Sequence, residues 1–96
     1  MKYKLMLKTH LKTNLKYLCK TIKDDPTYKG SGKHWRNHLN IHGRDVSSEL
    51  LFSSNNITEF SQVCLEYSKT LDVVDSNEFA NLIPENGLDG GDTYSN

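Results

Sequence analysis

Three of the four histidines lie in one short segment, Gly30–Gly43, which reads GSGKHWRNHLNIHG. His34, His38 and His42 are four residues apart, so on a helix their side chains lie along one face. Two imidazoles at this spacing can chelate zinc, but a stable zinc site needs three or four ligands. The segment contains no acidic residue and no cysteine, so the spacing alone supports zinc only weakly.

The same segment carries the residue types that hold a phosphate. His34, Arg36 and His38 fall in the first turns of a predicted helix, close to the backbone amides of the GSG turn, where a helix start favours an anion. A guanidinium also suits negative charge that develops on a phosphoryl group. For His42, next to Gly43, we favour a simpler role as a partner of the helix C-terminal dipole.

Basic residues are concentrated in the first half of the chain. Residues 1–44 contain eleven Lys or Arg and two acidic residues, whereas residues 45–96 contain ten acidic residues and one basic residue, Lys69. Clustered cations release counterions from a nucleic acid whatever the net charge, which here is zero. The split therefore favours a phosphate-facing side, unless the charges mix in space when the chain folds.

The length and composition limit the class of protein. Ninety-six residues, 35% of them hydrophobic, indicate one small domain with a modest core. No apolar run is long enough to cross a bilayer, so we expect an intracellular protein with no membrane partner. Cys19 and Cys64 have no CxxC partner, which favours two buried, reduced thiols over a disulfide.

Alternation of apolar and polar residues predicts strands over 2–8 and 15–22, joined by a turn in which Asn14 takes a positive φ. A helix is expected from Lys33 to His42, ended by Gly43, with Ser31 as a possible cap. A third strand is expected over 45–53. It is predicted to carry Val46, Leu50 and Phe52 on one face.

A second helix is predicted after the turn at Asn56, with either Thr58 or Asn56 as its cap. Its apolar residues recur at a period of 3.6, at Ile57, Phe60, Val63, Cys64, Tyr67 and Leu71. A short helical turn is expected to end at Pro84. The order β-β-α-β-α predicts an α+β fold, a small three-stranded antiparallel sheet flanked by helices, in one domain over 1–84 with a flexible tail over 85–96.

Glu66 is the best candidate for a ligand of a hard metal ion. It is the only acidic residue in the second helix between Glu59 and Asp72. A carboxylate completed by water binds Mg²⁺ readily. A solvent-facing Glu66 agrees equally well with the spacing.

Four runs, LKTHLKTNLKYLCKT, YKGSGKHWRNHLNIHG, LEYS and NLIPENGLDGG, together resemble the GIY-YIG nuclease family, particularly its small phage-encoded members that are like homing endonucleases. The resemblance covers residues 3–91, and its most specific part is the pattern YxGSGxxWxxHLxxHG. It implies a metal-dependent DNA endonuclease that hydrolyses phosphodiester bonds with Mg²⁺ or Mn²⁺ in the cytoplasm of a bacterial host. It implies no small-molecule cofactor.

The resemblance also implies roles for individual residues. Tyr17 resembles the tyrosine that lies near the attacking water, and His34 falls where the family usually has an arginine, with Arg36 and His38 nearby. Glu66 resembles the glutamate that holds the metal ion in the family, and Asn81 resembles an asparagine late in the family's sequence that braces the site. We expect further DNA contacts from Lys20, Tyr28, Lys29, Ser31 and Lys33.

Two positions depart from the family pattern. The tyrosine of the first motif falls at Met6, and the glycine that closes the second motif is Cys19. An alternative function is therefore a catalytically decayed GIY-YIG-like module that still binds DNA, and a less favoured one is protein binding through the acidic half. Catalysis requires that Tyr17, the imidazoles and Glu66 meet around a common cleft.

Overall fold

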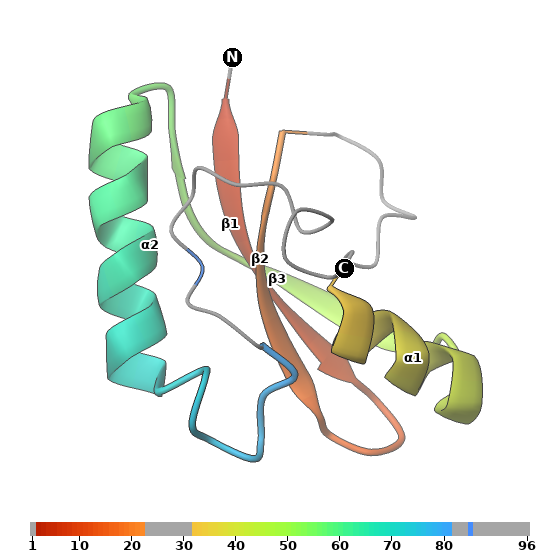
Figure 1. Ribbon diagram of the computed structural model, residues 1–96. Helices are drawn as coiled ribbons and strands as arrows, with labels where there is room; N and C mark the ends of the chain where they lie inside the picture. The colour runs from red at the N-terminus through yellow and green to blue at the C-terminus, as the bar shows by residue number, and fades with distance from the viewer. Residues whose placement is uncertain (1, 23–31, 82–84, 86–96) are drawn as a thin grey trace.

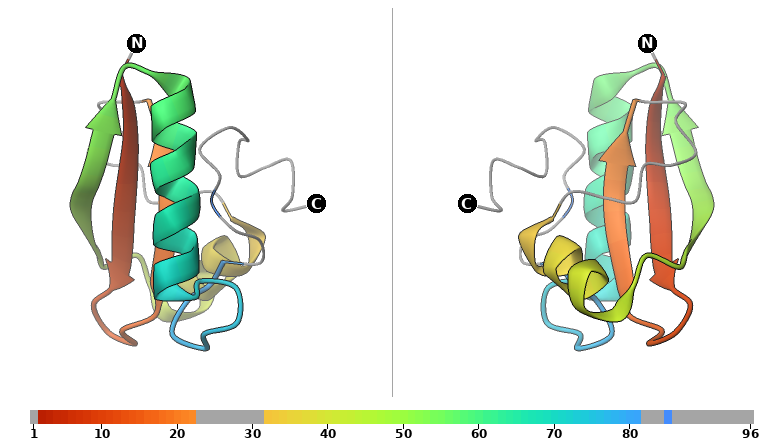
Figure 2. Two further views of the ribbon diagram at one scale, coloured as in Figure 1. Left: turned by 90° about the vertical axis from the view of Figure 1, so that its left-hand side faces the viewer. Right: turned by 90° about the vertical axis from the view of Figure 1, so that its right-hand side faces the viewer.

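The computed structural model describes residues 2–22, 32–81 and 85. Its elements are β1 (Tyr3–His10), β2 (Lys16–Thr21), α1 (Lys33–His42), β3 (Val46–Ser54) and α2 (Ile57–Leu71). The strands, labelled in Figure 1, form one antiparallel sheet in the order β2-β1-β3, and the right-hand view of Figure 2 shows β1 in the centre. The predicted α+β class, a three-stranded antiparallel sheet with flanking helices, is confirmed.

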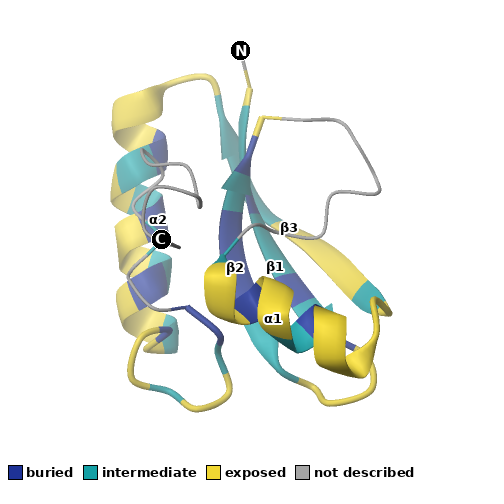
Figure 3. Cartoon of the chain, turned by 45° about the vertical axis from the view of Figure 1, so that its right-hand side comes forward, coloured by how far each residue is buried: buried dark blue, intermediate teal, exposed yellow. Residues whose placement is uncertain are grey.

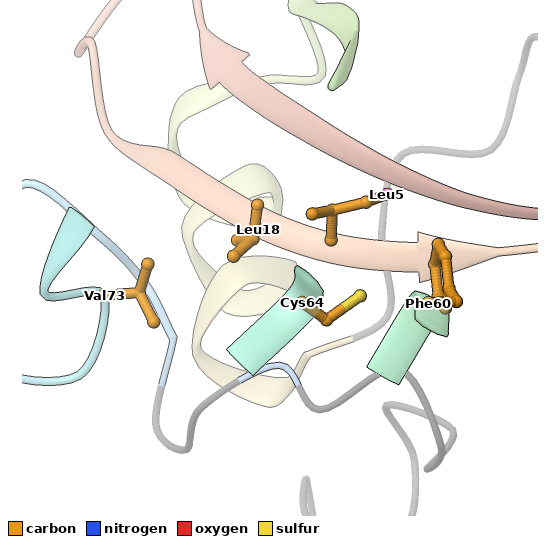
Figure 4. Packing of buried hydrophobic residues seen from close by; sticks show 5 residues of the cluster. All are labelled: Leu5, Leu18, Phe60, Cys64 and Val73. Carbon is orange, nitrogen blue, oxygen red and sulfur yellow. The ribbon is translucent and has the colours of Figure 1, made fainter. Parts of the chain in front are cut away.

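The two helices pack on opposite faces of this sheet (Figure 2). On the first, here called the α2 face, the buried cluster consists of Leu5, Leu18, Phe60, Cys64 and Val73 (Figure 4). On the second, the α1 face, it consists of Tyr17, Cys19, Trp35, Leu39 and Ala80. Because side chains alternate along a strand, Tyr17 and Leu18 belong to different faces, and the sheet separates the residues that α1 and α2 contact.

Local signals define one end of each helix as the sequence predicts. The start of α1 differs, because its N-cap is Gly32, with no side-chain cap hydrogen bond, and not Ser31. Gly43 follows α1 with a φ of 101° and donates its N–H to the carbonyl of Leu39, at 2.9 Å. The Asn56 side chain caps α2 by accepting the N–H groups of Thr58 and Glu59, at 3.0 and 3.1 Å. In the hairpin between β1 and β2, Asn14 has the predicted positive φ, 67°.

The prediction that Val46, Leu50 and Phe52 share one face is wrong. Phe52 pairs with Leu5, but Leu50 pairs with Met6, so β3 has one residue more than β1 at this point. This bulge resets the alternation. Phe52 therefore packs on the α2 face, whereas Leu50 lies on the α1 face and is 54% exposed.

The segment after α2 closes the outer edge of β2 instead of forming a helix within 75–81. Lys16 donates its N–H to the Glu78 carbonyl and accepts the N–H of Ala80, both at 2.8 Å. These two bonds form a parallel bridge at Phe79. The end predicted for the short helix, Pro84, lies outside the described residues, as do residues 86–96 of the predicted tail. Among the described residues, no helix has the length and apolar character required to span a membrane.

Candidate functional site

Tyr17 lies on β2 beneath the start of α1. Its side chain is 6% exposed, and its ring stacks on that of Trp35 with centroids 5.5 Å apart. Gly32, the N-cap of α1, lies so close that a Cβ there would be 2.6 Å from the Tyr17 hydroxyl oxygen. The backbone at Gly32 thus lies close to the phenol of Tyr17, the tyrosine to which the family resemblance pointed.

The rings continue from Trp35 into a histidine cluster, which we define as His10, His38 and His42. His38 is nearly parallel to Trp35, with centroids 6.3 Å apart, and lies 4.4 Å from His42. His10, on β1, meets His38 edge-on at 5.0 Å. Among the described residues, no group of three or more His, Cys, Asp or Glu side chains is arranged to hold a metal ion.

His10 joins the hairpin to the end of α1. Its Nδ1 accepts the backbone N–H groups of Lys12 and Thr13, at 3.3 and 3.2 Å. The proton of a neutral ring must then be on Nε2, which donates to the Gly43 carbonyl at 2.9 Å. His10 is fully buried, and no role was predicted for it from sequence, although alternation along β1 puts it on the same face as Met6 and Lys8.

His38 lies beside the hairpin between β1 and β2 and is partly exposed. Its Nε2 lies 2.7 Å from the Thr13 hydroxyl, within hydrogen-bond distance. Burial lowers the pKa of His38, and the nearby His42, His10 and His34 lower it further. The neutral imidazole is therefore the form that this environment favours.

The exposed side of α1 is a separate surface. The α1 surface, as we call it, surrounds an open hollow of about 560 Å³ lined by Lys33, His34, Arg36, Asn37 and Asn40. All five are exposed, and α1 contains no acidic residue. In Figure 3 this side of the helix faces outward while its other side is buried against the sheet. The structure thus groups the predicted residues His34, Arg36 and Lys33 in one hollow, and places His38 beside the hairpin instead.

Glu66 is not part of this arrangement. It is exposed on α2, where it lines another hollow, of about 460 Å³, with Gln62, Leu65 and Lys69. Because α2 packs on the opposite face of the sheet from Tyr17, the predicted common cleft does not form. Among the described residues that line this hollow, Glu66 supplies the one carboxylate and Lys69 a cation, which does not fit a Mg²⁺ site with several oxygen ligands from the protein.

Two more of the predicted site residues are Asn81, which lies beside β2, and Lys20, which is part of β2. The buried Asn81 accepts the Leu18 N–H and donates to the Leu18 carbonyl, both at 2.9 Å, and so braces the strand beside Tyr17. Lys20 is half-buried and lies on the same face of β2 as Leu18, away from the α1 surface. The other predicted DNA contacts, Tyr28, Lys29 and Ser31, lie outside the described residues.

Lys8 is a buried cation that the sequence analysis did not single out. It lies directly opposite Tyr17 in the pairing of β1 with β2, is 4% exposed and donates to the Ser48 hydroxyl at 2.7 Å.

Burial raises the pKa of both thiols, Cys19 and Cys64, to about 12, so neither is a reactive thiolate at neutral pH. Both cysteines are free and buried, as predicted.

Comparisons of the chain with protein-family models, with curated protein sequences and with solved structures give no match. The chemistry of the residues is therefore the basis for a function.

Proposed function

We propose that this chain binds DNA and that the α1 surface contacts the sugar–phosphate backbone. The observation that carries the proposal is the composition of the hollow on α1. Among the described residues, its lining consists of two cations, one imidazole and two amides, with no carboxylate. Such a surface attracts a polyanion, because each phosphate that a Lys or Arg neutralises releases a condensed counterion. The concentration of basic residues in the first half of the sequence supports the same proposal.

Metal-dependent hydrolysis of the phosphodiester, as an endonuclease, is the second candidate function. It is favoured by the resemblance over residues 3–91 and by the contact between the Tyr17 phenol and the start of α1, next to Lys33 and His34. Against it stand the position of Glu66 on the other side of the sheet and the absence of a tyrosine at Met6. We therefore place DNA binding first, and derive no hydrolytic step through Mg²⁺ or Mn²⁺.

One experiment tests both functions. Supercoiled plasmid is incubated with the purified protein at several salt concentrations, with and without Mg²⁺ or Mn²⁺, and is examined for retardation and for nicking. We expect retardation that weakens with salt and does not require metal. The double variant Lys33→Ala/Arg36→Ala should reduce the slope of log affinity against log salt by about 2, roughly 1 for each phosphate contact that is lost.

Lys69→Ala is the matched control, because it removes an exposed cation from α2 on the other side of the sheet. It should change the slope less than the loss of either α1 cation. If Lys69→Ala reduced the slope as much as the loss of one α1 cation, affinity would follow the total charge of the protein and not the α1 surface. Nicking that depends on metal and is lost in Tyr17→Phe would favour the endonuclease over a binding module.

A further inference from the structure

The outermost stripe of α1 has a pattern that backbone binding alone does not require. On the exposed side of α1, away from the buried Trp35 and Leu39, one stripe has side chains at spacings of three and four residues, Lys33, Arg36, Asn37 and Asn40. The exposed Ile41 lies next to this stripe. Arg44, just beyond the helix, returns to this stripe, because its Nη2 donates to Oδ1 of Asn40 at 2.6 Å. Cations therefore lie toward both ends of the stripe, and two uncharged amides occupy its middle.

We propose that α1 enters the major groove of duplex DNA, where Asn37 and Asn40 contact the edges of the bases. This inference rests on the proposed DNA binding and goes beyond it, because it assigns sequence readout to the same surface. The major groove is about 12 Å wide and admits a helix of about 10–12 Å diameter. The ten residues of α1 extend about 15 Å, enough to cross a few base pairs.

The amides suit base edges better than they suit phosphates. A neutral amide gains nothing from counterion release, which rewards cations. The Asn37 amide can both accept from and donate to one adenine, through N6 and N7. The Arg44 guanidinium already donates a hydrogen bond to Oδ1 of Asn40. The amide NH2 group of Asn40 can then donate to base acceptors, such as guanine N7 and O6 or thymine O4. Lys33, Arg36 and Arg44 would then contact the phosphates on either side of the groove.

The test begins with selection of the duplexes that the full chain binds best from a pool of random-sequence DNA. Affinities for the selected duplex and for the unselected pool are then measured at one fixed salt concentration. In parallel, dimethyl sulfate treatment of the selected complex reports guanine N7, which lies in the major groove. We expect enrichment of one sequence, and protection of guanine N7 at the site.

The variants Asn37→Ala and Asn40→Ala should each weaken binding to the selected duplex roughly tenfold more than binding to the pool, the cost of one lost base contact. Gln62→Ala, which removes an exposed amide from α2, is the matched control and should leave this ratio unaltered. Urea unfolding of each variant checks that the fold is retained.

Binding of all duplexes with equal affinity, or a selected site with unprotected guanine N7, would overturn the major-groove inference and leave backbone binding intact. An equal effect of the asparagine variants on selected and unselected DNA would do the same. If no duplex is bound even at low salt, the proposed function fails as well, so the two failures are distinguishable.

Discussion

The hydroxyl oxygen of Tyr17 lies against the backbone of Gly32, where an added Cβ would be only 2.6 Å away. Two ring carbons of Tyr17 would lie 2.8 Å from the same Cβ. Because Gly32 has an ordinary extended conformation, with a φ of −60°, space and not backbone strain requires a glycine here. This contact sets how closely the start of α1 approaches the sheet.

Gly32→Ala should therefore destabilise the protein by about 1–3 kcal/mol, the usual cost of overpacking. The cost arises because Tyr17 is buried under Trp35 and has little room to move. Urea unfolding measures it. In a background of Tyr17→Leu the same substitution should cost less, because the smaller side chain leaves room for the new methyl group.

Gly43→Ala is the matched comparison for this prediction. A Cβ at Gly43 would meet no atom of the described residues within 4 Å beyond its chain neighbours, but the φ of 101° is unfavourable for any residue with a side chain. Its cost, of about 1–3 kcal/mol, should be the same with or without Tyr17→Leu. A loss of stability in Gly32→Ala that is also independent of Tyr17 would show that the contact is not the cause.

The Asn81 side chain supplies two hydrogen bonds to β2 that no backbone group provides. Asn81→Leu would leave the N–H and carbonyl of Leu18 without these partners, so we expect a loss of about 1–3 kcal/mol in unfolding free energy. Asn55→Leu, at an exposed position between β3 and α2, should have a much smaller effect. Equal effects of the two substitutions would contradict the bracing role.

The helices were predictable from sequence because their ends depend on nearby residues. Gly43 after α1 and Asn56 before α2 act within one turn of the chain, and both helices have the bounds that these signals indicate. The hairpin at Asn14 is local in the same sense. Trp35 and Leu39, four residues apart in sequence, are the buried residues through which α1 packs on the sheet.

Relationships across the sheet were not predictable in this way. Periodicity shows that a helix has a buried side, but not which face of the sheet it covers, so Glu66 was expected beside Tyr17. The bulge at Leu51 depends on the pairing of β3 with β1, which involves residues far apart in the chain. His10 has no conspicuous neighbours in sequence, and its role appears only when the hairpin meets Gly43.

The environment of His38 predicts that stability decreases in mild acid. Its pKa in the folded protein is below the ordinary value of about 6.5. The folded chain therefore binds fewer protons than the unfolded chain as the pH falls through that value. Unfolding free energy should decrease as the pH falls below about 7, and the contribution of His38 should level off once the folded form is also protonated.

His38→Gln should flatten this pH dependence, because glutamine does not titrate and its amide can still reach Thr13. His34→Gln removes an exposed imidazole from the same helix and should retain more of the dependence. Urea unfolding at pH 7.5, 6.5 and 5.5 separates the two variants by the slope of stability against pH. If His38→Gln has the same slope as the original chain, His38 is not the group responsible.

Glu66→Ala decides whether the geometry or the resemblance is the better guide to catalysis. Glu66 is exposed on α2, on the other side of the sheet from Tyr17 and the α1 surface, so its loss should change DNA affinity by less than about twofold and stability by less than about 0.5 kcal/mol. If the chain nicks plasmid with Mg²⁺, the variant should do so at a similar rate, whereas a metal ligand would cost orders of magnitude. Loss of nicking in Glu66→Ala, with DNA binding and the unfolding transition retained, would require Glu66 to reach the bound phosphate. That outcome would restore the endonuclease as the leading function, because a carboxylate on the outer side of α2 has no other route to affect hydrolysis and spare binding.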